Sequence, residues 1–192
     1  MLGNETEFAE RLFEELDLRE TSLADRFFEN CTFTKCQLLE ADLRRARFID
    51  CAFNGCDLSN ANVTSAVFRD CTFTDSKLVG LNWPSAKTIS HLEIEKCLLN
   101  YSNFTGVNLR KSVVRDCVAR ETEFAEANMS ETDCRGTDFN GARFSNTNLT
   151  KADLRGARNY SIRPLDNKIK KARFSLPEAT LLLYGLDIEI EE

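Results

Sequence analysis

The chain has 192 residues, the size of one domain, and its 31 Asp and Glu exceed its 25 Lys and Arg, giving a formal net charge of −6. Because nucleic-acid-binding domains are usually basic, this balance predicts no direct nucleic-acid binding. The longest apolar run, Leu181–Tyr184, is far too short to cross a membrane, and the acidic N-terminal stretch carries no secretory signal. With 42% hydrophobic residues, including 14 Phe, we expect a cytoplasmic protein with a substantial core.

An apolar residue, the centre of each repeat, recurs at every fifth position from Phe8 to Leu154, with a one-residue slip between Pro84 and Thr88. Five residues advance an α-helix by about 500°, and in a strand an odd period puts successive centres on opposite faces. Neither element buries such a pattern. The chain must therefore turn once per repeat and coil as a solenoid.

The number of sides follows from like residues that recur every 20 positions. Twenty residues at five per side make four sides per coil, so the sequence predicts an all-β helix of square section. Two Phe series form its structural core: Phe28, Phe48 and Phe68, and Phe33, Phe53 and Phe73. Outward asparagines keep the same step and are predicted to form amide ladders: Asn62, Asn82 and Asn103 on one side, and Asn108, Asn128 and Asn148 on another.

Two stretches depart from the regular pattern. Arg11 and Arg26 occupy inward positions, which predicts an irregular first coil. A short helix over residues 5–16 is the alternative to a solenoid there, and the solenoid is preferred. The slip predicts a bulged corner or small loop at Pro84–Thr88.

The eight cysteines have three possible explanations: a metal cluster, a disulfide frame, or small buried hydrophobes. Seven of them lie at the small inward position, two residues before a centre, and Cys134 is itself a centre. No Cys-x-x-Cys pair occurs and His91 is the single histidine, so zinc-site spacing is absent. We therefore predict buried thiols, no metal and no cofactor, with His91 in solvent at a corner.

The C-terminal segment has a different pattern. Ser175 and Glu178 have the spacing of a capping box, which predicts a helix over residues 176–184 that stops at Gly185. A strand pattern follows over residues 186–190. The helix is apolar on more than one side, so one side can plug the coil while another joins a second copy. The predicted dimer interface comprises Leu181, Leu182, Leu183, Tyr184, Leu186, Ile188 and Ile190.

The repeat resembles that of the pentapeptide repeat family, with Ala41–Arg45 and Ala152–Gly156 as close matches to its pattern. The resemblance covers residues 6–158 and implies a right-handed quadrilateral β-helix. We predict two segments, the repeat solenoid over residues 1–158 and a capping and dimerisation segment over 159–192. Residues 170–179 and 186–190 resemble the topoisomerase-protecting branch, which includes albicidin-resistance, quinolone-resistance and microcin-immunity proteins. That resemblance implies a C-terminally joined homodimer that mimics DNA and binds DNA gyrase or topoisomerase IV, in a role connected with antibiotic resistance.

The charge distribution limits DNA mimicry to part of the surface. Duplex DNA carries one negative charge per about 1.7 Å, whereas residues 5–158 hold 25 acids and 20 bases. The excess lies in residues 1–30, with nine acids and three bases. Two outward acidic columns are the candidate partner contacts: Glu10, Asp50 and Asp70 in one, and Glu20 and Glu40 in the other.

Two other functions compete with topoisomerase binding. Catalysis is disfavoured because the sequence lacks nucleotide-binding, zinc-protease and serine-hydrolase motifs, and a filled coil offers no substrate cavity, so we predict that the protein is not an enzyme. A scaffolding solenoid with another protein partner is the alternative function, because a fold does not determine a function.

Overall fold

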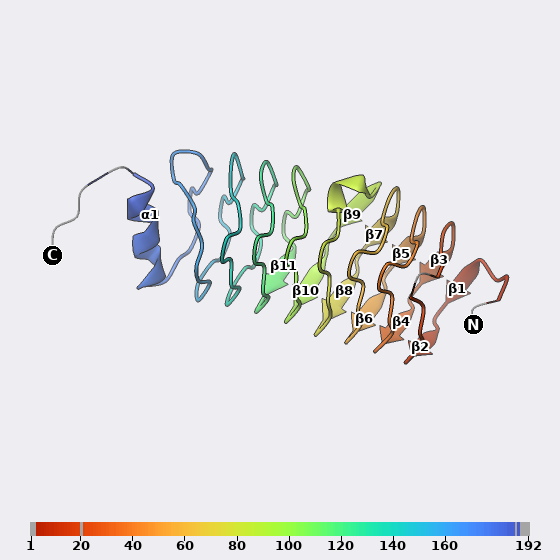
Figure 1. Cartoon of the computed structure of the whole chain (residues 1–192). Helices are drawn as coiled ribbons and strands as arrows, with labels where there is room; N and C mark the ends of the chain where they lie inside the picture. Colours follow the sequence, from red (N-terminus) through yellow and green to blue (C-terminus); the bar gives the residue numbers. More distant parts are fainter. Residues whose placement is uncertain (1–2, 20, 187, 189–192) are drawn as a thin grey trace.

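The computed structural model describes residues 3–19, 21–186 and 188. The chain winds as a right-handed β-helix of square section, and its two ends lie at opposite ends of the coil (Figure 1). Strands of three residues form two of the four sides. They are β1 (Glu7–Ala9), β2 (Leu12–Glu14), β3 (Phe27–Glu29), β4 (Thr32–Thr34), β5 (Arg47–Ile49), β6 (Ala52–Asn54), β7 (Val67–Arg69), β8 (Thr72–Thr74), β9 (Thr88–Ser90), β10 (Glu93–Glu95) and β11 (Val113–Arg115).

The strands pair in parallel with the register that the 20-residue step predicts. One sheet has the order β1-β3-β5-β7-β9 and the other β11-β10-β8-β6-β4-β2. Phe28 pairs with Phe48, and Phe33 with Phe53. Isolated parallel bridges, such as Asp17 to Gln37, link the remaining two sides from coil to coil. The first coil therefore contains strands over residues 5–16, and the alternative of a helix there is wrong.

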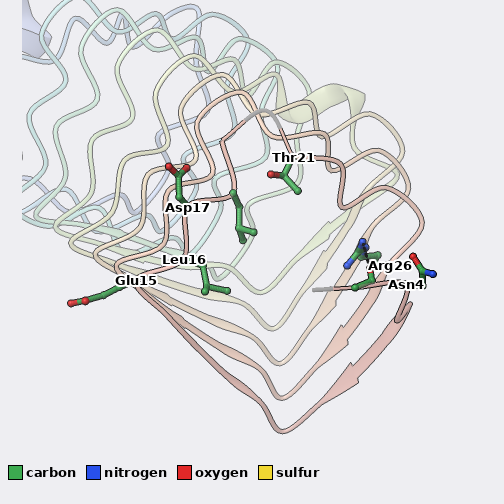
Figure 2. A pocket seen from close by; sticks show the side chains of 8 residues that line it. Asn4, Glu15, Leu16, Asp17, Thr21 and Arg26 are labelled. Atoms are coloured by element: carbon green, nitrogen blue, oxygen red, sulfur yellow. Dashed lines mark hydrogen bonds between the residues drawn. The ribbon is translucent and has the colours of Figure 1, made fainter. Parts of the chain in front are cut away.

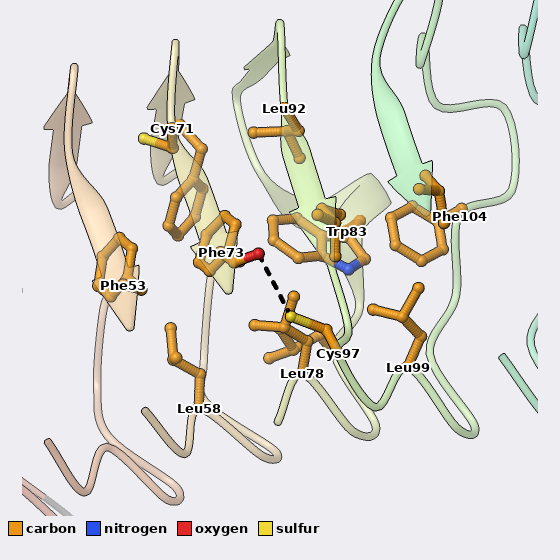
Figure 3. Close-up of a cluster of buried hydrophobic side chains, with 14 of the residues drawn as sticks. Phe53, Leu58, Cys71, Phe73, Leu78, Trp83, Leu92, Cys97, Leu99 and Phe104 are labelled. Atoms are coloured by element: carbon orange, nitrogen blue, oxygen red, sulfur yellow. Dashed lines mark hydrogen bonds between the residues drawn. The ribbon is translucent and has the colours of Figure 1, made fainter. Parts of the chain in front are cut away.

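The core is a set of stacked aromatic columns. Every centre from Phe8 to Leu154 is buried except Ile89, which is partly buried. The rings of Phe33 and Phe53 stack with centroids 4.8 Å apart, as do those of Phe53 and Phe73. Figure 3 shows this column beside Trp83, whose ring stacks on Phe104 at 5.6 Å. The six core phenylalanines are fully buried, as the sequence predicts.

The corners need a left-handed backbone. The residue two places after a centre has a positive φ in coil after coil, such as 51° at Asp50, 52° at Lys35 and 63° at Gly55. An Asp or Asn that stands just before the turn often closes it with a side-chain hydrogen bond. The Oδ1 of Asp42, for example, accepts the N–H of Arg44 at 3.1 Å. This local bond explains why Asp and Asn precede so many centres, because their side chains bind backbone two residues on.

The amide ladders form in part. The Nδ2 of Asn128 donates to Asn108 and that of Asn148 donates to Asn128, each at 3.2 Å. Asn103 likewise donates to Asn82 at 3.1 Å. The Oδ1 of Asn62 instead accepts bonds from the N–H and hydroxyl of Thr64. Asn62 therefore closes its own turn, where the sequence predicts a ladder.

The one-residue slip produces the predicted irregular corner. A 3-10 turn, η1 (Trp83–Ser85), precedes β9. The N–H groups of Lys87 and Thr88 both approach the carbonyl of Ala66, at 2.8 and 3.4 Å. Two residues thus oppose one, which is a bulge. Pairing resumes in register, since Phe68 lies opposite Ile89.

The C-terminal helix is shorter than predicted. A 3-10 turn, η2 (Glu178–Thr180), leads into α1 (Leu181–Tyr184). The capping box is wrong, because the hydroxyl of Ser175 accepts the N–H of Gly156 at 2.8 Å in the preceding coil. Gly185 ends α1 with φ −77°. A Cβ there would lie 2.9 Å from Cδ of Pro164, so close packing rather than a positive φ requires glycine.

Coil-to-coil pairing continues beyond residue 158. Asn148 pairs with Lys168 and Asp153 with Arg173, while Tyr160 and Ile162 are buried in the core. The division into segments 1–158 and 159–192 remains a prediction. Of the predicted strand over 186–190, Leu186 lies in a turn, and Asp187, Glu189 and Ile190 lie outside the described residues.

Candidate functional site

The first coils present acidic side chains on the outer face of β1 and β3 and at the corner that follows β1 and β5, whereas the outward residue of β5 is the exposed Arg47. Glu10 and Asp50 are exposed at positive-φ corner positions of one column, with Asn30 between them. Strand alternation turns Phe8 inward and Glu7 outward, and Glu29 projects outward from β3. We call Glu7, Glu10, Glu29 and Asp50 the acidic patch. None of the four carboxylates forms an ion pair with a described residue.

The structure places the other predicted contact residues differently. Asp70 shares the column of Asp50, but its Oδ1 lies 3.0 Å from Nδ1 of His91 and its Oδ2 3.8 Å from Arg69. Glu40 is exposed in a separate corner column, and Glu20 lies outside the described residues. Glu7 and Glu29 were not predicted. The sequence could have predicted both, because in a strand the residues on either side of an inward Phe centre face outward.

Many other acids are neutralised by arginines. Asp42 binds Arg44 through two hydrogen bonds of 2.8 Å, which lower the pKa of its carboxyl to about 2. Arg19 likewise lowers the pKa of Asp17 to about 2, and Arg45 of the next coil lowers that of Asp25. These paired acids add little net negative potential. The accessible negative charge of the first coils comes from the acidic patch together with Glu14 and Glu40, which are exposed and form no ion pair with a described residue.

The corner column of Glu10 changes sign along the coil. After Asp70 it continues with His91, Lys111, Glu131, Lys151 and Lys171, all with positive φ. These residues follow one another at the same 20-residue step, so the change from acidic to basic side chains along the column can be read from the sequence. His91 is exposed at its corner, as predicted.

The cysteines line the inside of the coil at the predicted positions. All eight are buried free thiols. The Sγ of Cys51 donates to the carbonyl of Phe28 at 3.5 Å, and that of Cys71 to Phe48 at 3.4 Å. Burial raises the pKa of both thiols to about 12. Such thiols are poor nucleophiles and poor metal ligands. Within the described part of the chain no group of three or more His, Cys, Asp or Glu side chains is arranged for a metal ion.

A pocket lies at the N-terminal opening of the coil (Figure 2). Its polar lining includes Glu15, Asp17 and Arg26. Glu15 forms an ion pair with Lys35 at 3.3 Å, and Asp17 with Arg19 at 2.6 Å. Arg26 donates to the carbonyl of Gly3 at 3.1 Å. The carboxylates are thus held by cations, and the lining offers no histidine, serine or cysteine for acid–base or nucleophilic chemistry.

The C-terminal end presents apolar side chains to solvent. Leu182 packs against the core and closes the coil. Leu181 and Leu183 are more than one-third exposed, and Tyr184 and Ile188 more than half. Leu165 and Leu176 enlarge this apolar surface, at 76% and 78% exposed. Of the predicted interface residues, Leu186 is half-buried and Ile190 lies outside the described residues. No described helix is long and apolar enough to cross a membrane.

Comparison with known proteins connects these features to a family. The sequence matches the pentapeptide repeat region over residues 26–104 and 46–124, and the pentapeptide repeats (8 copies) over residues 127–158. No curated protein matches it. Among solved structures, full-length QnrB1, a plasmid-mediated fluoroquinolone resistance protein, is 19% identical with a TM-score of 0.47, covering 95% of this chain and 100% of that one.

HetL, a pentapeptide repeat protein involved in regulating heterocyst differentiation in the cyanobacterium Nostoc, is 18% identical with a TM-score of 0.43, and the match covers 88% of each chain. The family matches together extend over more than half of the sequence. This chain belongs to the pentapeptide repeat family.

Proposed function

We propose that this protein is a non-catalytic binding protein whose acidic exterior mimics DNA and binds DNA gyrase or topoisomerase IV. The observation that carries the proposal is the acidic patch of Glu7, Glu10, Glu29 and Asp50, whose carboxylates form no ion pair with a described residue. The four carboxylates belong to three successive coils, and neighbouring coils are about 4.8 Å apart. They therefore present negative charge at intervals along an axis, as a duplex does. The resemblance of residues 170–179 to topoisomerase-protecting proteins directs the proposal to this partner.

The filled interior supports binding over catalysis. The centres and the inward cysteines, such as Phe53, Cys56 and Leu58, are almost fully buried. A partner can therefore contact only the outer faces of the coil. Catalytic sites require positioned acids, bases or nucleophiles, and the exposed acids of the first coils are either in contact with a basic side chain or spread over the outer surface of several coils.

A titration of gyrase supercoiling tests the function. Purified protein is added to gyrase with relaxed plasmid, with and without a topoisomerase poison. We expect the protein to change supercoiling in at least one of the two conditions, by inhibiting the enzyme or by relieving the poison. The absence of any effect in both conditions contradicts topoisomerase binding and favours a scaffold for another protein.

We further propose that two copies join through the apolar C-terminal surface of Leu165, Leu176, Leu181, Leu183, Tyr184 and Ile188. Exposed apolar patches of this kind mark interaction sites, and a second copy is the occupant because two-fold self-association is the commonest oligomer. Sedimentation velocity at micromolar concentration tests this. We expect a dimer that Leu181→Glu with Leu183→Glu converts to a monomer, while Leu12→Glu, at a more exposed leucine of the opposite end, leaves it intact. A monomeric wild type contradicts the proposal.

A further inference from the structure

The face that begins with the acidic patch ends in a group of lysines. Bridges run in one column from Asn108 to Asn128, Asn148 and Lys168. In the adjoining corner, the N–H of Lys151 donates to the carbonyl of Lys170 at 2.9 Å, which places Lys170 and Lys171 one coil beyond Lys151. Lys111 lies two coils before Lys151 in the same column. We call Lys111, Lys151, Lys168, Lys170 and Lys171 the basic face.

These lysines keep their charge uncompensated. All five are exposed, and none lies in an ion pair with a described residue. The carboxylate that lies among them, Glu131, is bound by Arg110 at 2.9 Å. Its pKa is lowered first by that hydrogen bond and further by the charges of Arg110, Lys111 and Lys151. The surroundings of Glu131 are therefore strongly positive, in a chain whose net charge is −6.

The side chains between the lysines are polar. They are the amide ladder of Asn108, Asn128 and Asn148, together with Thr150, whose N–H donates to the Oδ1 of Asn148 two residues earlier. Protein–protein interfaces have an apolar, charge-depleted centre, and this face has none. Protein–DNA interfaces are more polar and more positive, and Lys, Ser, Thr and Asn are the residues that contact phosphates. The chemistry favours a nucleic-acid backbone over an acidic protein.

We propose that the basic face binds the phosphate backbone of duplex DNA without reading its sequence. From Lys111 to Lys171 the face extends over three coil steps, about 14 Å at the interstrand spacing. A duplex of that length carries about eight phosphate charges, so five lysines can neutralise those turned toward the face. The flat side of a solenoid has no projecting element to enter a groove, which confines contacts to the backbone.

The proposal is independent of topoisomerase binding. The acidic patch belongs to the first coils and the basic face to the last, and the contact of His91 with Asp70 lies between them. A single chain can therefore present one end to a protein that binds DNA and the other to DNA itself. The prediction of no nucleic-acid binding rests on total charge, which conceals this separation.

Fluorescence polarisation with a labelled 20-base-pair duplex tests the basic face without gyrase. Binding is measured from about 50 to 200 mM salt for the wild type and for Lys151→Gln/Lys171→Gln. The matched control is Lys35→Gln/Lys96→Gln, because these lysines are also exposed at positive-φ corners, with φ 52° and 54°, and the net charge changes equally. Thermal melting of both variants checks that they fold.

The wild type should bind the duplex, with affinity falling as salt rises, and the Lys151/Lys171 variant should weaken binding and flatten the logarithmic salt slope by about 2. The control should match the wild type. No binding by the wild type at 50 mM salt, or equal losses in the two variants, overturns the proposal. Tighter binding of labelled poly-glutamate than of the duplex assigns the face to an acidic protein instead and also overturns it.

Discussion

The first and last coils have the same backbone but are held together inside by different side chains. In the first coils, Phe columns stack at about 4.8–5.1 Å, and thiols such as that of Cys71 occupy the small inward position. In the last coils, Val114, Ala119 and Cys134 are centres, and threonines occupy the inward position. The hydroxyl of Thr147 donates to the carbonyl of Phe124 at 2.8 Å. Two stacked Phe columns fill the first coils, whereas the last coils combine a single stacked column, Phe104–Phe124–Phe144, with buried hydroxyl bonds.

The outer surfaces differ between the two regions just as the interiors do. Strand pairing and corner geometry depend on the backbone and on the inward residues, so the outward residues are free to change from the acidic patch to the basic face. Substitutions of inward residues should therefore change stability, and substitutions of outward residues should change recognition.

The largest expected effect comes from removing a ring in the first coils. Phe53 is fully buried and stacks on both Phe33 and Phe73. Phe53→Ala should cost about 3–5 kcal/mol of unfolding free energy through lost burial and the cavity. Urea denaturation measures this, with Asn54→Ala on the outer face as the control. A cost below about 1 kcal/mol contradicts the stacked-column core.

The corresponding test in the last coils removes a hydroxyl. Thr137 accepts the N–H of Cys117 at 3.2 Å and donates to the carbonyl of Val114 at 2.7 Å. Thr137→Val keeps the shape but leaves both backbone groups unpaired, which should cost about 1–3 kcal/mol. Cys71→Ser in the first coils is the comparison and should cost less unfolding free energy. A serine fits this inward position, because the hydroxyl of Ser76, the next inward residue, donates to the carbonyl of Phe53 as the thiol of Cys71 donates to that of Phe48. Equal losses of unfolding free energy in Thr137→Val and Cys71→Ser would contradict the distinction between the two interiors.

A smaller effect is expected at the corners, which both regions share. Gly55 has φ 63°, and a Cβ there would meet only Cγ of Lys35 at 3.6 Å, an ordinary contact. Gly55→Ala therefore isolates the left-handed strain and should cost about 1–2 kcal/mol. Lys35→Gly, one coil earlier in the same column with φ 52°, should be neutral or stabilising. Thermal denaturation measures the stability of both variants. A Gly55→Ala variant as stable as the wild type contradicts the corner geometry.

The smallest effect concerns a paired acid. The folded pKa of Asp42, about 2, lies below its usual value near 3.9, so the pair with Arg44 stabilises the protein above about pH 4. That contribution is lost as pH falls through about 2. Since the pair is partly exposed, Asp42→Asn should cost less than about 1 kcal/mol at pH 7.

Denaturation at pH 7, 4 and 2.5 checks the sign. The difference between the wild type and Asp42→Asn should narrow as the pH falls. Asp116→Asn, which removes an exposed carboxylate that forms no ion pair with a described residue, is the control substitution. A difference that widens toward low pH contradicts the assignment.

The sequence period predicts most of the architecture. The step of five requires every centre to face inward, and the recurrence of like residues every 20 positions determines the four sides, the register and the Phe columns. It predicts the ends poorly. Ser175 and Glu178 have the spacing of a helix cap, but Ser175 binds Gly156 of the previous coil, a tertiary contact that local sequence cannot reveal. The same limit applies to the candidate site: periodicity aligns Glu10 with Asp50, while the contacts of Asp70 with His91 and Arg69 depend on side-chain geometry.

Displacement of a labelled duplex from gyrase tests the central claim, that the exterior acids of the first coils bind the enzyme in place of DNA. The test variant is Glu7→Gln/Glu10→Gln/Glu29→Gln/Asp50→Asn, and the control is Asp75→Asn/Glu93→Gln/Glu121→Gln/Glu126→Gln, which neutralises four other exposed acids. The account predicts that the wild type and the control displace the duplex and that the acidic-patch variant does not. Equal displacement by all three proteins, or by none, contradicts it.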